Sequence, residues 1–284
     1  FRLRKRQLEK NEMKFAVIGS GQTRKLLRTQ LNKTFGSVNK DFYFHTWDHA
    51  HNPNWKKLQS FFPDATIQVE RYEDKFDNYS QIRNIGNVDQ LRYHFAQFYT
   101  VLKSFKLVNK EYDFYFRTRT DIGYSNDALE FFDPSHRNWE FFKRMTWHAL
   151  KNTTSQETWR ELVSDNENLL VNNDDIENKA MNIKPIIWTG LRMHDPIHGV
   201  LFDDFSWTMN HKAFKLMQEL DIDEIMRKVI NLKKDNELGV QSPLIWSAII
   251  KELGIYLIDA PVTGRITRNK VTEQQIVAQY GDIT

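Results

Sequence analysis

The sequence has no cysteine among its 284 residues. This absence excludes disulfide bonds, iron–sulfur clusters and thiolate zinc sites, and it is compatible with a reducing compartment. Any metal ion must therefore be bound by oxygen or imidazole ligands. The chain also has no apolar run of the roughly 20 residues that a membrane helix needs, and no charged-then-apolar signal peptide opens it. We therefore expect a soluble, cytoplasmic protein.

Linkers and repeats are missing too. No stretch is rich enough in Gly, Pro or Ser to divide the chain, and there is no internal repeat. We predict a single domain over residues 13–284, preceded by a basic N-terminal extension or linker over residues 1–12. The first ten residues read FRLRKRQLEK. They are typical of a solvated basic helix, and they also suit a linker from an upstream domain or a peripheral contact with a membrane surface.

A strong charge of one sign is absent as well. The 40 Lys and Arg residues nearly balance the 37 Asp and Glu residues, for a formal charge of +3. This balance gives little support for a nucleic-acid partner. By contrast, hydrophobic residues make up 40% of the chain and aromatic residues 13%. This composition excludes a disordered chain and predicts a folded protein with a sizeable core.

Periodicity predicts an α/β fold. The apolar run Lys14–Ile18 is followed by Gly19-Ser-Gly21 and by leucines on one helix face, which indicates strand, turn and helix. Strands at 41–48 and 65–70 and a helix at 87–108 then favour a parallel sheet. Further strands are expected at 185–188, 199–207 and 254–259 and further helices at 211–220 and 242–253, whereas residues 126–182 show no clear pattern.

Charged residues end the strand that leads to Asp121. In an extended chain Arg117, Arg119 and Asp121 point to the same face of a sheet, and ligands of open α/β sheets collect at the carboxyl ends of strands. Guanidinium groups suit phosphate oxygens, and a carboxylate suits a divalent cation that bridges phosphates. The alternative is an Arg–Asp network that locks the sheet edge.

The segment Tyr112–Asp121, YDFYFRTRTD, resembles the Arg-x-Arg-x-Asp strand of polysaccharide-type glycosyltransferases with a GT-A fold. Such enzymes are encoded in bacterial surface-glycan loci and by large viruses and phages. Three more segments are similar to motifs of that family. They are Phe44–Asp48 (FHTWD), Ala96–Lys103 (AQFYTVLK) and Asp203–Met209 (DDFSWTM).

The resemblance implies a GT-A-like (Rossmann-like) central sheet, mostly parallel and flanked by helices, with an inserted helical or irregular middle segment. It also implies a nucleotide-sugar donor, from which a hexosyl or deoxyhexosyl group moves to a hydroxyl of a glycan or glycolipid. GT-A enzymes usually hold Mn²⁺ or Mg²⁺ with an Asp-x-Asp motif. Here Arg119 takes the place of the first Asp, and metal dependence stays open because an arginine can itself neutralise a diphosphate.

In such a fold the first turn would contact the nucleotide through Gly19, Ser20, Gly21 and Arg24, since glycine admits close backbone approach and a helix N-terminus offers amide donors. Arg24 stands where a dinucleotide fingerprint needs a third glycine, which weakens a dehydrogenase interpretation. A tight strand-to-helix turn is the alternative role for the glycines. Asp48, at the end of the second predicted strand, is a further candidate for the donor site.

The helix predicted at 87–108 carries three polar candidates for the donor site, Arg92, Gln97 and Lys103. Gln97 and Lys103 have this role through the family resemblance, and Arg92 lies upstream, where it could reach a phosphate. For each of them a solvated side chain is the alternative.

Asp203 and Asp204 are adjacent in an otherwise apolar predicted strand, so one of them should face the cleft. A carboxylate there could take the proton of the acceptor hydroxyl as general base. A strand-end turn or cap is the alternative. His198 could join Asp121 as a metal ligand, by similarity to a C-terminal histidine of some GT-A enzymes, although an isolated histidine is more often structural.

The sequence therefore favours a nucleotide-sugar-dependent glycosyltransferase, with Arg117 and Arg119 beside the diphosphate and Asp121 on a divalent cation or a donor hydroxyl. Two alternatives stay open. A sugar-phosphate nucleotidyltransferase would normally show a longer glycine-rich basic loop after the first strand. A non-catalytic glycan- or nucleic-acid-binding module would use the aromatic and basic residues instead.

Overall fold

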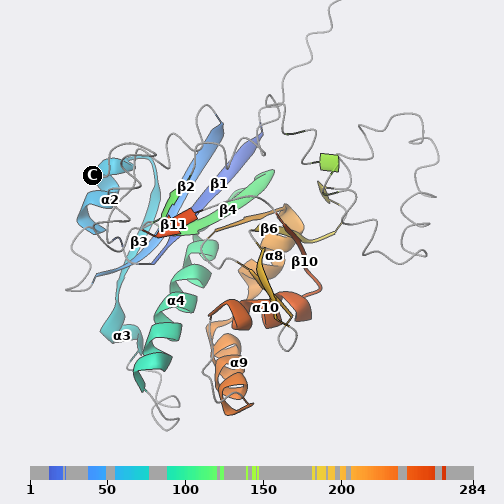
Figure 1. The fold of residues 1–284 in the computed structure, drawn as a ribbon. Helices are drawn as coiled ribbons and strands as arrows, with labels where there is room; N and C mark the ends of the chain where they lie inside the picture. The colour runs from blue at the N-terminus through green and yellow to red at the C-terminus, as the bar shows by residue number, and fades with distance from the viewer. Residues whose placement is uncertain are drawn as a thin grey trace, which may run out of the picture.

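The computed structural model of the chain describes segments built around one central β-sheet (Figure 1). The described segments are residues 13–21, 23, 38–48, 55–76, 88–119, 122–124, 139, 143–144, 146, 181–182, 184–189, 191–195, 199–202, 206–235, 242–259 and 264–266. The inserted middle segment predicted from the sequence lies almost wholly outside them.

The sheet has seven strands in the order β10-β6-β9-β4-β1-β2-β3. Strands β3, β2, β1 and β4 pair in parallel, as do β6 and β10, while β9 runs antiparallel between β4 and β6. The bounds are Lys14–Ser20 (β1), Asn39–Asp48 (β2), Thr66–Arg71 (β3), Phe114–Arg119 (β4), Ile186–Thr189 (β6), Trp207–Met209 (β9) and Tyr256–Asp259 (β10).

Helices cover both faces of the sheet. Helix α4 (Val88–Leu107) lies along one face together with α8 (His211–Glu219), α9 (Ile222–Asp235) and α10 (Ser242–Glu252), as Figure 1 shows. On the other face α2 (Trp55–Phe61) packs on β2. The short helix α3 (Tyr72–Phe76) follows β3 directly and contacts α4. The predicted α/β fold, a mostly parallel central sheet flanked by helices, is therefore confirmed.

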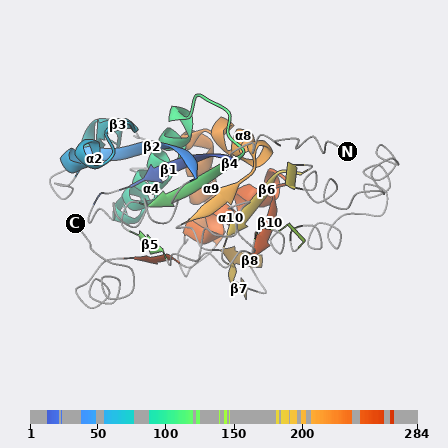
Figure 2. The same cartoon turned by 90° about the horizontal axis from the view of Figure 1, so that it is seen from above.

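Two small antiparallel sheets accompany the main one. Strand β5 (Ile122–Tyr124) pairs with β11 (Gly264–Ile266), and β7 (Leu191–Asp195) pairs with β8 (Gly199–Phe202). The β7–β8 hairpin lies next to α10 (Figure 2). Within the described ranges, no helix is both long and apolar enough to cross a membrane.

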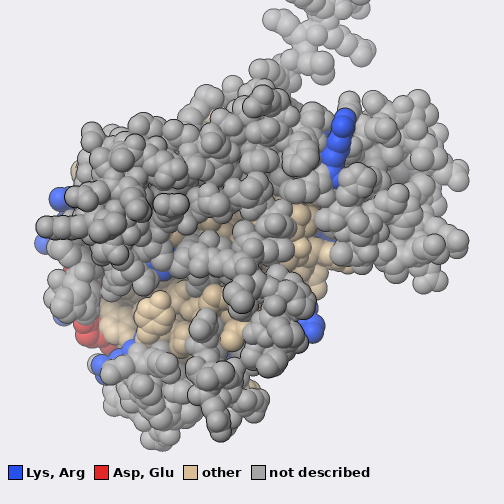
Figure 3. All heavy atoms as spheres, in the orientation of Figure 1, with Lys and Arg blue, Asp and Glu red and all other residues tan. Residues whose placement is uncertain are grey.

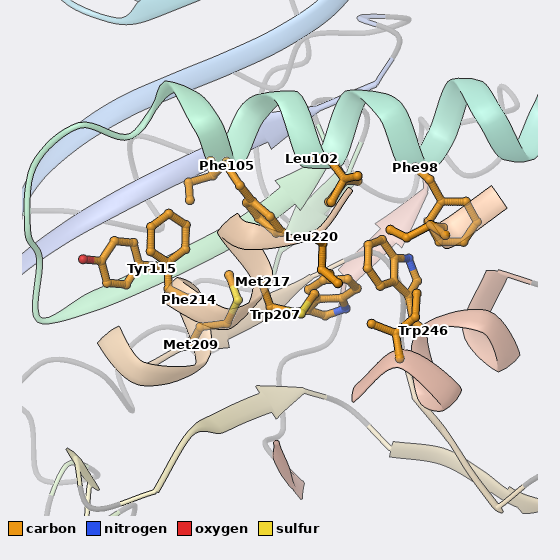
Figure 4. Packing of buried hydrophobic residues seen from close by; sticks show 14 of the residues in the cluster. Phe98, Leu102, Phe105, Tyr115, Trp207, Met209, Phe214, Met217, Leu220 and Trp246 are labelled. Carbon is orange, nitrogen blue, oxygen red and sulfur yellow. The ribbon is translucent and has the colours of Figure 1, made fainter. Parts of the chain in front are cut away.

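Strand alternation divides the core into two layers, because successive side chains of a strand point to opposite faces. In β1, Ala16 and Ile18 point toward α4, whereas Phe15 and Val17 point toward α2. Burying one large apolar side chain contributes about 1.5–3 kcal/mol, so the two layers together hold the sheet in register. Figure 4 shows the α4 layer, whose members include Phe98, Leu102, Phe105, Trp207, Phe214 and Trp246.

Asn210 joins β6, β9 and α8 at one fully buried point. Its side-chain oxygen accepts hydrogen bonds from the backbone N–H groups of Ala213 at 3.0 Å and Ile186 at 3.1 Å, and so caps α8. Its amide nitrogen donates to the carbonyl oxygens of Met181 at 2.8 Å and Lys184 at 2.6 Å. This side chain therefore fixes the start of α8 against the start of β6.

One predicted strand is wrong. The sequence predicts a single strand over 199–207, but β8 ends at Phe202 and β9 begins at Trp207, and the two belong to different sheets. Adjacent carboxylates at Asp203 and Asp204 interrupt the apolar run. The other predicted strands and helices that fall on described residues agree with the structure to within two residues at each end. Helices α2, α3 and α9 and strands β5, β7 and β11 are not predicted.

Replacing Asn210 with Ala should lower the free energy of unfolding by about 2–4 kcal/mol, because it removes a helix cap and leaves buried N–H and carbonyl groups without their partners. Asn210→Ser keeps an oxygen for the cap but loses both amide donors, so it should be intermediate. Urea unfolding followed by circular dichroism measures both losses. Equal unfolding free energies for wild type and Asn210→Ala would contradict this role.

Candidate functional site

The strand order creates a topological switch point between β1 and β4. From β1 the chain moves to β2 and β3 on one side of β1, and after α4 it returns to β4 on the other side. In open α/β sheets, ligands bind outside the carboxyl ends of the strands at such a point, where connections leave in opposite directions and open a crevice. Here these ends are Ser20 and Arg119.

Four polar side chains lie in register across the sheet at the level where β1 and β4 end; we call them the polar row, and they are Ser20, His45, Gln68 and Arg119. Ser20 is in register with Arg119 on one side and with His45 on the other, and His45 is in register with Gln68. Register partners point to the same face. Because Ile18, two residues before Ser20, points into the α4 layer, the polar row lies on that face.

The turn after β1 is held by β2. Gly21 has a φ of 102°, a conformation that glycine adopts without strain. The Gly21 N–H donates to the His45 carbonyl at 3.3 Å, and the Thr46 hydroxyl donates to the Gly21 carbonyl at 2.8 Å. A Cβ at Gly21 would meet no described atom within 4 Å. The turn therefore leaves room for a ligand to approach its backbone.

Gly19 needs to be glycine for a different reason. It lies inside β1, and a Cβ there would come within 2.3 Å of the Phe44 ring. That ring packs against Phe42 and Phe62 in the α2 layer, so it has little room to move. Gly19 thus allows close packing of β1 on β2, and it faces away from the polar row. This packing accounts for the glycine without a ligand.

Glu70 collects hydrogen bonds beside the polar row. Its carboxylate lies 3.2 Å from His45 Nε2, accepts from Gln68 Nε2 at 3.1 Å, and is 3.6 Å from Lys75 Nζ. Tyr99 of α4 also forms a hydrogen bond with it. The hydrogen bond with His45 is the largest cause that lowers the pKa of Glu70 to about 2, and it outweighs burial, which acts in the opposite direction.

His45 is held as a neutral ring. Burial lowers the pKa of His45 below its usual value, although the hydrogen bond with Glu70 acts to raise it. Since an ionised carboxylate can only accept, the proton of the ring belongs on Nε2. The rings of Trp47 and Tyr99 stand edge-on to His45, with centroids at 5.3 and 5.8 Å. The ring therefore has one orientation and one tautomer.

Arg117 and Arg119 share the α4 face, as predicted, but lie at different depths. Arg117 is fully buried, and its guanidinium carbon is 4.9 Å from the ring centroid of Trp207, its partner in register. Arg119, at the end of the strand, is half-buried. Arg119 is therefore the cation at the switch point, while Arg117 packs in the core next to it. A direct contact between Arg117 and a ligand stays a prediction.

Two other predicted residues form hydrogen bonds between secondary-structure elements. Asp48 is exposed, points to the face opposite the polar row, and accepts a hydrogen bond from the Trp55 indole at 3.0 Å, where α2 begins. Gln97 accepts a hydrogen bond from the Ser242 hydroxyl at 2.6 Å and so ties α4 to α10. Both contacts have a structural purpose, and donor binding by these residues stays a prediction.

Lys103 and Arg92 differ in their distance from the polar row. Lys103 Nζ lies 5.3 Å from the ring centroid of Tyr99, the residue that bonds Glu70. Arg92 is exposed on α4, and its carbonyl accepts a hydrogen bond from the Tyr72 hydroxyl at 3.3 Å. On the face shown in Figure 3, the described Lys and Arg side chains are scattered and form no continuous patch. Of the two, Lys103 is the better placed to influence the site.

Five predicted residues, Arg24, Asp121, His198, Asp203 and Asp204, lie outside the described residues, so their roles stay predictions. Asp121 belongs to the link between β4 and β5. In the part of the chain that the structure describes, no group of three His, Asp or Glu side chains could hold a metal ion. The proposed metal ligands are not among those residues.

His45, Glu70 and Tyr99 are site residues that the sequence prediction assigns no role. A signal for His45 exists in the sequence. It alternates with Tyr43 and Trp47 in a strand and therefore occupies an inward position, where a polar side chain is unfavourable unless it is hydrogen-bonded. Its partner Glu70 comes from the next strand, and no local pattern identifies it.

Known proteins resemble this chain weakly. No protein-family model matches it, and no curated protein does. Among solved structures it is similar to inositol-1-phosphate CTP transferase from T. maritima (TM-score 0.39, 10% identity, 95% of each chain covered). It is also similar to mouse xyloside xylosyltransferase 1, with a TM-score of 0.39 and 9% identity over 87% of this chain and 84% of that one. A third similar structure is 4-diphosphocytidyl-2C-methyl-D-erythritol synthase from Anaerococcus prevotii, with a TM-score of 0.32 and 9% identity over 94% of each chain. Likeness at this level says nothing about the chemistry of the site.

Gly19→Ala should lower the free energy of unfolding by about 1–3 kcal/mol, because its Cβ would overlap the Phe44 ring in a packed layer. In a Phe44→Leu background the Cβ has room, so the double variant should lose less than the sum of the two single losses. Gly21→Ala is the control, since its cost comes from φ and should not depend on Phe44. Urea unfolding of these variants gives the coupling, and strict additivity for Gly19 would contradict the steric account.

Glu70→Gln should destabilise the protein by about 1–3 kcal/mol at pH 7, since hydrogen bonds to a charged acceptor become weaker. The folded-state pKa of Glu70 is lowered to about 2, so its stabilisation is complete above the unfolded value near 4.5 and fades as pH falls toward 2. The difference from wild type should therefore shrink between pH 5 and pH 3 in urea unfolding. Exposed Glu219→Gln is the control. A gap that does not depend on pH would refute the assignment.

Proposed function

We propose that the chain is a glycosyltransferase that moves a sugar from a nucleotide-sugar donor to a hydroxyl of a glycan or glycolipid acceptor. The observation that supports this function most is the meeting of the Ser20–Gly21 turn with Arg119 at the switch point of the sheet. A turn whose backbone can be approached, with a cation next to it, suits a nucleoside diphosphate.

Arg119 supplies positive charge for the diphosphate. Its guanidinium can donate two parallel hydrogen bonds to phosphate oxygens, and its half-buried position strengthens them relative to a fully solvated side chain. During transfer the bond between the sugar C1 and the phosphate oxygen breaks, and its electron pair leaves with the nucleoside diphosphate. A cation fixed at that oxygen stabilises the charge that develops there. Arg119 thus binds the donor and stabilises the nucleoside diphosphate as it leaves.

The acceptor hydroxyl forms the new bond to C1 and gives up its proton. We assign this proton to Asp203 or Asp204, acting as general base. Both precede β9, which is antiparallel to β4 with Trp207 in register with Arg117. In that register the chain direction from Met209 to Trp207 runs toward the carboxyl end of β4, the end that carries Arg119, and Asp203 and Asp204 come shortly before Trp207 in the sequence. The position of these carboxylates in the chain therefore supports the role.

Asp121 is the proposed ligand of Mn²⁺ or Mg²⁺, or of a hydroxyl of the donor sugar. In the sequence it comes two residues after Arg119, the last residue of β4. His198 is the second proposed ligand, and a carboxylate with an imidazole is a donor set that suits Mn²⁺ better than Mg²⁺. When bound, such a cation would add charge neutralisation at the diphosphate.

In thermal-shift measurements, nucleoside diphosphates and nucleotide sugars should stabilise the wild type, by about 2.7 kcal/mol at a hundredfold excess over Kd. Arg119→Ala should weaken binding of a nucleoside diphosphate about tenfold to a hundredfold, because a charged hydrogen-bond donor is lost. Exposed Arg227→Ala on α9 is the matched control and should bind like the wild type. The same series with and without Mn²⁺, in wild type and in Asp121→Ala, tests whether the ion strengthens nucleotide binding through Asp121.

The donor site is misplaced if no nucleotide shifts the wild type, or if Arg119→Ala responds as strongly as Arg227→Ala. Product analysis separates the two enzyme classes. A glycosyltransferase releases a nucleoside diphosphate and forms a glycoside. A sugar-phosphate nucleotidyltransferase instead releases pyrophosphate from a nucleoside triphosphate and forms the sugar nucleotide.

A further inference from the structure

Two atoms of the polar row, Ser20 Oγ and His45 Nδ1, have no hydrogen-bond partner among the described residues. Both residues are buried, with 2% and 1% of their surface exposed. An unpaired buried polar atom costs about 1–3 kcal/mol, and such atoms are few in native proteins. The pairing of β1 and β2 sets these two side by side on the same face. Together they form a two-point hydrogen-bonding position.

His45 presents an acceptor at this position. The Nε2–H group donates a hydrogen bond to the Glu70 carboxylate, with Nε2 3.2 Å from the oxygen, so the other nitrogen of the neutral ring carries a lone pair. Glu70 is held in turn by Gln68, and the rings of Trp47 and Tyr99 flank the imidazole. The direction of the lone pair is therefore fixed before any ligand binds, which reduces the entropy lost on binding.

His45 lies one strand from Ser20 and two strands from Arg119. Neighbouring strands are about 4.8 Å apart, so β2 is about 10 Å from β4 across β1. A nucleoside diphosphate extends over a span of this size from its phosphates to its nucleoside. Gly21 lies between them, and no atom of the described residues comes within 4 Å of where its Cβ would stand. A ligand that starts at Arg119 and passes Gly21 therefore reaches the end of β2.

We propose that His45 is a further binding residue of this site, whose Nδ1 accepts a hydrogen bond from an O–H or N–H group of the nucleoside, while Ser20 Oγ makes a second one. The inference rests on the proposed function and names the part of the ligand that is recognised. A ribose hydroxyl and an N–H group of the base both have the required chemistry. Phosphate oxygens do not, because they would face the lone pair of Nδ1. His45 therefore selects for the nucleoside and not for the diphosphate.

Two substitutions of His45 separate a binding role from a structural one. Asn places an amide oxygen near the position of Nδ1 but cannot reach Glu70, whereas Gln places an amide nitrogen near Nε2 and lacks the acceptor. The probe is whichever of UDP, GDP, ADP, CDP and dTDP shifts the wild type most, titrated calorimetrically. His45→Gln should raise its Kd about tenfold to a hundredfold, and His45→Asn by no more than about threefold.

Inorganic pyrophosphate is the control ligand, and its affinity should be the same in wild type and both variants. The reverse order, with His45→Gln like the wild type and His45→Asn impaired, would show that the contact with Glu70 matters and would overturn the inference. If no nucleoside diphosphate binds the wild type, the proposed function fails and the inference fails with it. If the wild type binds and His45→Gln binds equally well, the inference alone fails.

Ser20→Ala provides a second measurement that does not depend on the folding of the His45 variants. It should weaken binding of the same nucleotide about tenfold, yet the ligand-free protein should be no less stable in urea, since the removed hydroxyl has no partner to lose. Unchanged affinity in Ser20→Ala and His45→Gln together would overturn the inference. The 2′-deoxy and 3′-deoxy analogues of the probe identify the source: if a ribose hydroxyl is bound, one of them loses affinity in the wild type but not in His45→Gln.

Discussion

The candidate site depends on the parallel pairing of β1 with β2 on one side and with β4 on the other. This pairing sets Ser20 beside both His45 and Arg119 and creates the switch point at the same place. Packing enforces it, because the missing side chain at Gly19 admits the Phe44 ring. A slip of one residue would turn the apolar side chains of β1 to the wrong layers and Ser20 away from α4. The geometry of the polar row is therefore a property of the core.

In the hydrogen bonds around Glu70, the carboxylate is the acceptor and its neighbours are the donors. Gln68, the neutral His45 ring and Tyr99 all donate hydrogen bonds to one half-buried carboxylate, which stays ionised because these partners take the place of water. Because the one N–H group of the neutral His45 ring donates a hydrogen bond to Glu70, the other ring nitrogen must be an acceptor. A charge on β3 thus determines the chemistry offered one strand away. The side chains of the row act together, and the effect of changing one depends on the others.

Local patterns were sufficient where periodicity determines a face. The spacing of Phe98, Leu102 and Phe105 predicted α4, and alternation in the strand predicted that Arg117 and Arg119 share a side. Pairing between distant segments could not be predicted in this way. The insertion of antiparallel β9 next to β4, which buries Arg117 against Trp207, joins residues far apart in the chain. The contact of His45 with Glu70 depends likewise on strand order, which single-sequence patterns do not contain.

The short strand β9 has a consequence for how such a protein can change over time. The polar row comes entirely from the continuous stretch β1 to β4, whereas β6, β10 and helices α8 to α10 come from the later part of the chain. In the main sheet these two parts meet through the three residues Trp207–Met209. Outside the sheet, however, α8, α9 and α10 share one hydrophobic core with α4, and Ser242 of α10 donates a hydrogen bond to Gln97 of α4. A substitution in the later part therefore disturbs the earlier part when it faces α4, and is better tolerated when it faces solvent.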